Sequence, residues 1–180
     1  MLGSFWTFAN ILSICRIPLA ATAAVIILMD GPVSRSLILI FMAGFTDFLD
    51  GMIARSTNTI SGWGKILDPA ADKFSVVLLG AALVWKNLLP FWFLGAIVIR
   101  DVLIVAGGTF LTHRLGRIHM SNLVGKVTTT AIGATFILGL LKADAIVMDI
   151  FIWGTVGLLV VSLLIYAARL LNLRNNSTES

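Results

Sequence analysis

Four aspartates lie within one short stretch of an otherwise apolar chain, Asp47–Asp72. They are Asp47, Asp50, Asp68 and Asp72. Four carboxylates held together at the edge of a low-dielectric region would repel one another and tend to take up protons. A divalent cation relieves this repulsion, and all-oxygen ligands suit hard ions such as Mg²⁺, Mn²⁺ or Ca²⁺. The stretch therefore predicts a site for two ions with one bridging carboxylate, an arrangement suited to phosphoryl chemistry.

Two helices joined by a short polar loop, "STNTISGWG", must position these carboxylates. Because the connection is short, we expect the helices to be antiparallel neighbours whose faces can meet. At 100° per residue, the polar and small residues fall within an arc of about 140° on the first helix and form a narrow stripe on the second. The first face holds Asp47, Asp50, Gly51, Ala54 and Arg55, and the second holds Gly64, Asp68 and Asp72.

The residues between the aspartates indicate what the ions would act on. Arg55 supplies a planar fork of donors that suits phosphate oxygens. Gly51, Ala54 and Gly64 leave both faces without large side chains, so that a flat or bulky ligand can lie there. A structural network between the aspartates and nearby lysine and arginine is the alternative, and the matched helical faces disfavour it.

The elements around the motif are predicted from composition. Of the 180 residues, 58% are hydrophobic and only 12% are charged, whereas soluble domains are about 25% charged. Six apolar stretches approach the roughly 17–25 residues that span a bilayer as a helix. They cover 9–29, 34–54, 69–86, 88–112, 123–141 and 146–171. We therefore predict an all-α integral membrane protein with six transmembrane helices.

These helices are predicted to form a single transmembrane domain over residues 1–180. The first residues, Met1–Phe8, are rich in aromatic side chains and predict a short interfacial segment that leads into the first helix. The last residues, about 173–180, form a polar tail.

Basic residues gather at one end of the predicted helices. With both termini on one side, that side collects Arg55, Lys65, Lys73, Arg114, Arg117, Lys126, Arg169 and Arg174, and the other side receives Arg35, Lys86 and Lys142. The positive-inside rule therefore places both termini and the aspartates at the cytoplasmic face. The net charge of +4 can be explained without a nucleic-acid partner, because basic residues at helix ends can hold anionic membrane lipids.

A few polar side chains outside the motif lie within or beside the predicted helices. Arg100 and Asp101 fall near the middle of the fourth helix, where an ionisable pair is costly without a task or a partner. Local pairing of the two is the alternative to a function. Lys126 opens the fifth helix, near a helix N-terminus that favours anions. With Arg16, these cations could bind an acceptor that carries its own phosphate. The single cysteine, Cys15, is expected to be buried.

The motif can be written D-x-x-D-G-x-x-A-R-x₈-G-x₃-D-x₃-D, and the chain matches it at every fixed position. It closely resembles the signature of the CDP-alcohol phosphotransferases, integral membrane enzymes of phospholipid synthesis. The resemblance implies six transmembrane helices with the motif across the second and third, usually in a homodimer. The segment "ANILSICRIPLA" around Arg16 is similar to the family's P-N-x-L-T-x-x-R segment, with Ala9 for Pro and Ser13 for Thr.

The resemblance also implies a role for each residue of the motif. The four aspartates would ligate two divalent metal ions, usually Mg²⁺ or Mn²⁺. Gly51, Ala54 and Gly64 would make room for the cytidine nucleotide, and Arg55 would hold its diphosphate. Asp72 would also be the general base that takes the proton from the acceptor alcohol. The alcohol would then attack the β-phosphorus of CDP-diacylglycerol, and CMP would leave.

The identity of the acceptor depends on other segments. The sequences "GKILDPAADK" and "GKVTT" are similar to the branch that contains phosphatidylglycerophosphate synthase and the eukaryotic-type cardiolipin synthase. "RDVLIV" at Arg100–Val105 favours cardiolipin synthase, whereas the small size of the chain favours phosphatidylglycerophosphate synthase. We therefore expect sn-glycerol 3-phosphate as the acceptor, with phosphatidylglycerol as the alternative. A non-enzymatic ion or solute transporter is a remote alternative, because the acidic residues cluster at one face and no repeat is visible.

Overall fold

The computed structural model of the chain describes the backbone of residues 8–57, 64–115 and 123–176, and the side chains of residues 14–46, 70–107 and 123–168. The described residues form six helices, so the all-α prediction is confirmed. By its internal contacts the chain divides into two compact units, Met1–Leu89 and Pro90–Ser180. Each unit holds three helices, and each is described by itself. The prediction of a single domain stays a prediction.

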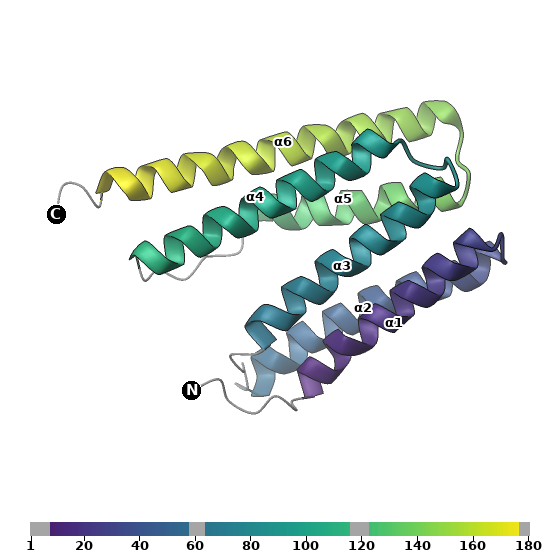
Figure 1. Cartoon of the computed structure of the whole chain (residues 1–180), viewed down its shortest axis with the longest axis horizontal. Coiled ribbons are helices and arrows are strands. Elements are labelled where there is room, and N and C mark those ends of the chain that lie inside the picture. The colour runs from purple at the N-terminus through teal and green to yellow at the C-terminus, as the bar shows by residue number, and fades with distance from the viewer. Residues whose placement is uncertain (1–7, 58–63, 116–122, 177–180) are drawn as a thin grey trace. The chain divides into compact units, whose positions relative to one another are not determined.

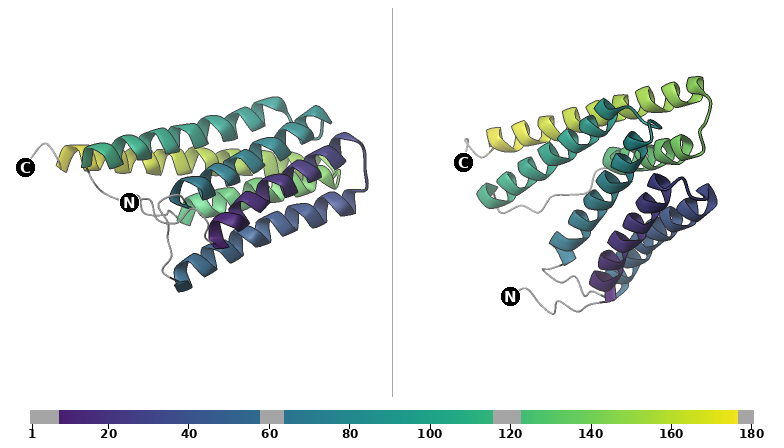
Figure 2. Two further views of the ribbon diagram at one scale, coloured as in Figure 1. Left: turned by 60° about the horizontal axis from the view of Figure 1, so that its bottom comes forward. Right: turned by 45° about the vertical axis from the view of Figure 1, so that its right-hand side comes forward.

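The N-terminal unit consists of α1 (Phe8–Leu28), α2 (Val33–Thr57) and α3 (Gly64–Trp85). Helix α1 packs against both α2 and α3, and the views in Figures 1 and 2 agree that α1 and α2 lie side by side. The C-terminal unit consists of α4 (Phe91–Leu115), α5 (Leu123–Leu140) and α6 (Ala145–Asn176). Helix α6 packs against both α4 and α5. In each unit, therefore, one helix contacts the other two.

The helix boundaries agree with the predicted apolar stretches to within a few residues. Helix α3 begins at Gly64, as predicted from the motif rather than from its apolar stretch. Helix α6 continues through Asn176 and so extends into the polar tail. The predicted interfacial segment, apart from Phe8, lies outside the described residues.

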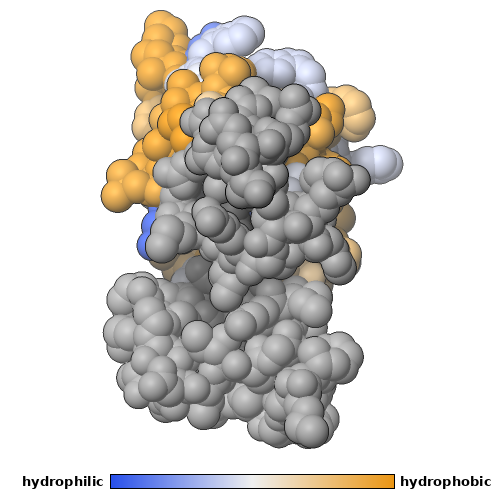
Figure 3. Space-filling view, turned by 90° about the vertical axis from the view of Figure 1, so that its left-hand side faces the viewer, coloured by the Kyte–Doolittle hydropathy of each residue, from blue (hydrophilic) through white to orange (hydrophobic). Residues whose placement is uncertain are grey.

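The described helices bury many small side chains and expose many large apolar ones, although Leu83, Phe93 and Ile97 are also fully buried. Buried positions include Ala20, Ala23, Ala43, Ala71, Ala82, Ser75, Thr128, Thr135, Thr155 and Ser162. Exposed positions include Phe41, Phe45, Ile146, Trp153 and Leu164. Apolar side chains accordingly colour much of the described surface that is visible in Figure 3. Soluble proteins favour the opposite distribution, whereas small residues at helix contacts and apolar residues facing outward are typical of a protein in lipid.

Two helices are long and apolar enough, over their described residues, to cross a membrane. They are Leu123–Leu140, which is all of α5, and Ala145–Ala168 of α6. The described parts of α1 and α2 contribute shorter apolar segments, Ile14–Leu28 and Val33–Thr46. The structure thus supports part of the six-span prediction, and the remaining spans stay a prediction.

The turns after α1, α3 and α5 share one backbone geometry. Each contains a polar residue with a positive φ, namely Asp30 (54°), Asn87 (56°) and Lys142 (53°). After α3, the amide of Leu88 donates to the carbonyl of Leu83 at 2.9 Å, and the amide of Asn87 donates to that of Val84 at 2.9 Å. The same pair of bonds closes the other two turns. This is the Schellman motif, which satisfies carbonyls at the end of a helix.

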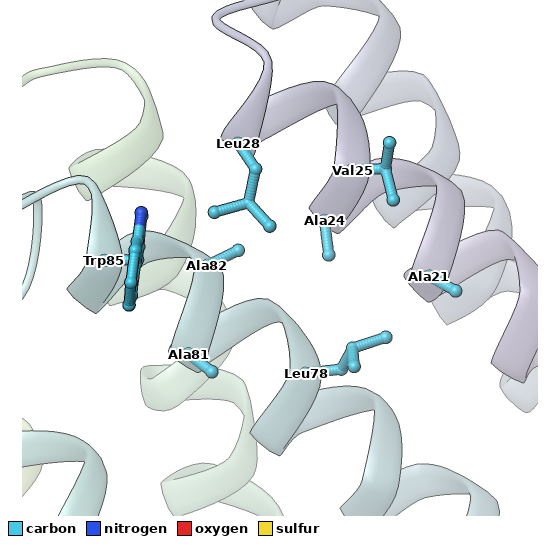
Figure 4. A pocket seen from close by; sticks show the side chains of 8 residues that line it. All are labelled: Ala21, Ala24, Val25, Leu28, Leu78, Ala81, Ala82 and Trp85. Carbon is cyan, nitrogen blue, oxygen red and sulfur yellow. The ribbon is translucent and has the colours of Figure 1, made fainter.

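A groove of about 600 Å³ runs between α1 and α3. Both helices line it with residues spaced i, i+3, i+4 and i+7, so that one face of each helix borders the groove (Figure 4). Helix α1 contributes Ala21, Ala24, Val25 and Leu28, and α3 contributes Leu78, Ala81, Ala82 and Trp85. Ala24 and Ala82 are buried. Small side chains at these two positions let the helices approach closely.

Replacing Ala82 by leucine is therefore expected to disturb the contact between α1 and α3. Ala82 is buried close to α1, so a larger side chain would press the two helices apart, and overpacking of this kind destabilises proteins by about 1–3 kcal/mol. The matched control is Ala81→Leu, because Ala81 is the neighbouring residue but is exposed. Thermal unfolding of the purified proteins in detergent measures the difference. Equal unfolding temperatures for the two variants would contradict this description of the contact.

The backbone conformation of the turn after α3 leads to a second prediction about stability. Asn87 is exposed and has a φ of 56°, a conformation that asparagine tolerates and that β-branched residues avoid. Asn87→Val is expected to destabilise the protein by about 1–3 kcal/mol through backbone strain alone. Asn87→Gly removes the same side chain without strain and is expected to keep at least the wild-type stability. The prediction fails if valine and glycine give the same unfolding temperature.

Candidate active site

The predicted motif lies at the end of α2 and the beginning of α3. Its backbone is helical on both sides of the connecting loop, as predicted. The side chains of residues 47–69 lie outside the described part of the structure. The predicted roles of Asp47, Asp50, Gly51, Ala54, Arg55, Gly64 and Asp68, and the predicted meeting of the two faces, therefore stay predictions.

Asp72 is the motif residue whose side chain is described. It is half-buried on α3, beside Ala71 and Ser75, which are 2% and 5% exposed. The hydroxyl of Ser75 donates to the carbonyl of Ala71 at 2.8 Å, so it is satisfied within the helix. Asp72 therefore lies next to a tightly packed face of α3 and is itself only partly covered.

Within residues 14–46, 70–107 and 123–168, no three His, Cys, Asp or Glu side chains form a group that could hold a metal ion. Three of the four predicted ligands, Asp47, Asp50 and Asp68, lie outside these ranges. The predicted metal site therefore stays a prediction. The donor set that the sequence supplies consists of carboxylates alone, which fits Mg²⁺ or Mn²⁺.

Arg16 is buried on α1, with 3% of its surface exposed. The prediction that the adjacent Cys15 is buried is wrong, because the structure exposes it. Successive residues of a helix are turned by 100°, and the buried face of α1 passes through Arg16, Ala20 and Ala23. Cys15 lies to one side of that face. Arg16 belongs to the N-terminal unit, whereas Arg100 and Lys126 belong to the C-terminal unit.

Arg100 is a buried cation on α4 with two identified partners. Its Nη1 lies 2.7 Å from Oδ1 of Asp101, so the local pairing considered from sequence is confirmed. Its Nη2 donates to Oγ of Ser162 on α6 at 2.7 Å. The side chains of Arg100 and Asp101 are only 7% and 13% exposed. Charge-assisted bonds of this kind offset the free energy of removing a charge from water.

Lys126 is exposed in the first turn of α5, as predicted. The preceding residue, Gly125, lies close to Arg100, because a Cβ added to it would be 3.8 Å from Nη2 of Arg100. Thr128 is fully buried one turn further on. Its hydroxyl lies 2.7 Å from the carbonyl of Val124 and 3.4 Å from the carbonyl of Leu158 on α6. Two of the predicted acceptor residues, Arg100 and Lys126, therefore belong to the same region.

Sequence reasoning missed the hydroxyl groups between α5 and α6. Thr135 and Thr155 lie 3.0 Å apart across this contact and are buried, and Ser162 holds Arg100 from the same helix as Thr155. The signal in the sequence that could have predicted these hydroxyl contacts was the spacing of the residues along each helix. Thr128 and Thr135 are seven residues apart in one apolar helix, and Thr155 and Ser162 are seven apart in the next. Polar residues repeated at this interval lie on one face of a helix and predict a contact with a neighbour.

Comparison with known sequences identifies the family. The sequence profile of the CDP-alcohol phosphatidyltransferases matches residues 6–161, which is most of the chain and includes the whole motif. The chain belongs to the CDP-alcohol phosphatidyltransferase family. The resemblance inferred from the motif is therefore confirmed. This family is embedded in membranes and generally depends on divalent metal ions.

Several curated relatives are named for one of two reactions. The chain is 37% identical over 110 residues to the cardiolipin synthase (CMP-forming) of Rattus norvegicus, covering 61% of this chain and 36% of that protein. It is 33% identical over 129 residues to the cardiolipin synthase (CMP-forming) of Streptomyces coelicolor, covering 68% and 60%. It is 36% identical over 94 residues to the CDP-diacylglycerol–glycerol-3-phosphate 3-phosphatidyltransferase of Bacillus subtilis, covering 52% and 48%.

The region of similarity covers about a third of the rat protein and about half to three fifths of the two bacterial proteins. The curated relatives are named as enzymes with different acceptors at similar identity. Family membership thus supports a phosphatidyltransferase reaction, and the names of the relatives do not select the acceptor.

Proposed function

We propose that this protein transfers the phosphatidyl group of CDP-diacylglycerol to an alcohol and releases CMP. The observation that carries the proposal is the complete motif from Asp47 to Asp72, at the spacing of the family, within a chain that the family profile matches over residues 6–161. The motif lies on two consecutive helices, α2 and α3, as the proposed site requires.

Different residues of the motif bind different parts of the substrate and the metal ions. Gly51, Ala54 and Gly64 leave room for the cytidine, and Arg55 holds the diphosphate with its planar fork of donors. The four aspartates hold two ions of Mg²⁺ or Mn²⁺, which when bound offset the negative charge of the diphosphate and of the departing CMP.

Asp72 accepts the proton of the acceptor alcohol. Its side chain is half-buried on α3, which agrees with a residue that is not sealed inside the helix contacts. As the proton moves to Asp72, the alcohol oxygen forms a bond to the β-phosphorus of CDP-diacylglycerol. The bond from that phosphorus to the oxygen of CMP breaks, and CMP leaves with the electron pair. A positioned carboxylate can serve as general base without a histidine.

The membrane arrangement follows from the same proposal. Six helices span the bilayer, both termini face the cytoplasm, and the protein forms a homodimer. The outward-facing apolar side chains of both units support the membrane position. An active site at the cytoplasmic face lets water-soluble CMP leave while the diacylglycerol chains stay in lipid.

The first candidate acceptor is sn-glycerol 3-phosphate, and Arg16, Arg100 and Lys126 are the cations that the sequence offers for its phosphate. This reaction is that of a phosphatidylglycerophosphate synthase, and the name of the Bacillus subtilis relative agrees with this candidate.

One observation favours a second candidate, cardiolipin synthase with phosphatidylglycerol as acceptor. Asp101 lies 2.7 Å from Arg100 and offsets its charge. Less net positive charge then remains for the acceptor, which suits a singly charged phosphodiester better than a doubly charged phosphate monoester. The names of the rat and Streptomyces relatives agree with this candidate.

An assay of CMP release distinguishes the candidates. Purified protein in detergent receives CDP-diacylglycerol and Mg²⁺ together with either sn-glycerol 3-phosphate or phosphatidylglycerol. We expect release with sn-glycerol 3-phosphate. Release with phosphatidylglycerol alone would establish the second candidate instead. If neither acceptor supports release in Mg²⁺ or Mn²⁺, the proposed reaction is wrong.

Asp72→Asn tests the base. The amide cannot accept the proton, so CMP release is expected to fall by at least about 100-fold, while CDP-diacylglycerol binding is partly kept. The matched control is Asp30→Asn, which removes only the exposed pair with Lys86 at the other end of the N-terminal unit. Near-normal turnover in Asp72→Asn would refute the assignment.

In the same assay, excess chelator should stop CMP release by the wild-type protein, and added Mg²⁺ should restore it.

A further inference from the structure

The groove between α1 and α3 in the N-terminal unit is lined by apolar side chains alone. Its floor contains the buried residues Ala24 and Ala82, whose small side chains leave the hollow. Its rim contains Val25, Leu28 and Trp85, which are 51%, 42% and 79% exposed. The groove therefore opens to the surroundings of the helices, and its occupant must be apolar.

The groove begins at the ends of both helices and runs inward along them. Leu28 ends α1 and Trp85 ends α3, and the two lie at the same end of the groove, whereas Ala21 and Leu78 lie at the other (Figure 4). Seven residues of helix cover about 10 Å, which is about two thirds of one leaflet of a hydrocarbon core about 30 Å thick. An acyl chain that hangs from the headgroup layer can follow the groove over this distance. Because α1 and α3 pack against each other, the groove suits a thin chain better than a helix about 10–12 Å across.

An ion pair marks the open end of the groove. Asp30 follows Leu28 by two residues and Lys86 follows Trp85, and Nζ of Lys86 lies 2.5 Å from Oδ2 of Asp30. The side chain of Asp30 is 82% exposed and that of Lys86 is 22% exposed. The lysine ammonium has three N–H donors, of which Asp30 takes one. Tryptophan and lysine are also typical of the headgroup layer.

The two charges of this pair match those of a zwitterionic headgroup, which carries a phosphate and an ammonium group. We propose that the groove between α1 and α3 binds an acyl chain of a zwitterionic phospholipid whose phosphate contacts Lys86 and whose ammonium contacts Asp30. Lipid tails gain little by leaving other lipid, so close packing and the headgroup contacts hold the molecule.

This lipid site is separate from the proposed active site. It lies along the last turns of α3, whereas Asp72 and the rest of the motif lie at the beginning of α3 and the end of α2. The bound lipid is thus not the phosphatidyl donor, and the proposal does not depend on the proposed function. A lipid that contacts both helices in the folded protein stabilises their contact.

Photocrosslinking tests the groove. Purified protein in detergent receives an equimolar amount of a phosphatidylethanolamine that carries a diazirine in one acyl chain. We expect crosslinks on residues 21–28 and 78–85 in preference to the exposed apolar residues of α6. Ala81→Phe fills the groove from its exposed rim and should reduce these crosslinks about fivefold through lost packing.

The matched control is Val77→Phe, which adds a ring at an exposed position of α3 outside the groove lining. This variant should keep the crosslinks. Without added lipid, both variants should unfold at the wild-type temperature, so a lost crosslink does not reflect a lost fold. Crosslinks spread evenly over the exposed helices, or equal crosslinking in the two variants, overturn the proposal.

A second variant tests the headgroup. Lys86→Met leaves the groove lining intact and should reduce capture of the phosphatidylethanolamine about twofold to fivefold, the range of an exposed charge contact. A diacylglycerol with the same diazirine lacks the phosphate, so the wild type and Lys86→Met should capture it equally. The control Lys142→Met removes an exposed lysine of the C-terminal unit and should change neither capture. Equal capture of the phosphatidylethanolamine by the wild type and Lys86→Met overturns the proposed headgroup contact. Because these experiments measure binding, a failure of CMP release would leave their outcome unaffected.

Discussion

A charge or polar group inside hydrocarbon needs a partner, and this requirement governs much of the chain. Each unsatisfied polar group at membrane depth costs several kcal/mol. The helices satisfy their own backbone, and buried hydroxyls such as that of Ser75 donate to the carbonyl of the preceding turn. Arg100 receives Asp101 and Ser162 as partners. Arg16 is a second buried cation, within α1, and many of the other charges lie near helix ends, where the proposed site also lies.

The same environment changes what holds the helices together. Lipid tails are as apolar as leucine, so large apolar side chains gain little by turning inward. The units instead use close approach and hydroxyl contacts. Ala24 and Ala82 lie where α1 and α3 meet, and Thr135 and Thr155 meet between α5 and α6. Many large side chains, such as Phe41 and Trp153, remain outside, where lipid can surround them, although Leu83, Phe93 and Ile97 are fully buried.

The helices and the location of the motif could be predicted from sequence because both depend on local information. A long apolar run must form a helix in lipid, and the spacing of the aspartates assigns them to consecutive helices. The position of Lys126 in the first turn of α5 followed in the same way. Partners that are distant in sequence could not be predicted. Ser162 is one serine in an apolar helix, and its bond to Arg100 depends on how α4 and α6 pack. Cys15 was assigned to the wrong face because hydrophobicity alone does not show which side of α1 meets α2 and α3.

The tight turn between α5 and α6 has a consequence for which insertions and deletions the chain can tolerate. Two backbone bonds, from Lys142 to Gly139 and from Ala143 to Leu138, close this turn, and α6 begins at Ala145. One additional residue absorbed into α6 would rotate the rest of that helix by about 100° and shift it by about 1.5 Å. Ser162 would then leave Arg100, although no side chain had changed. The length of this turn is therefore constrained as strictly as the identity of the residues that it aligns.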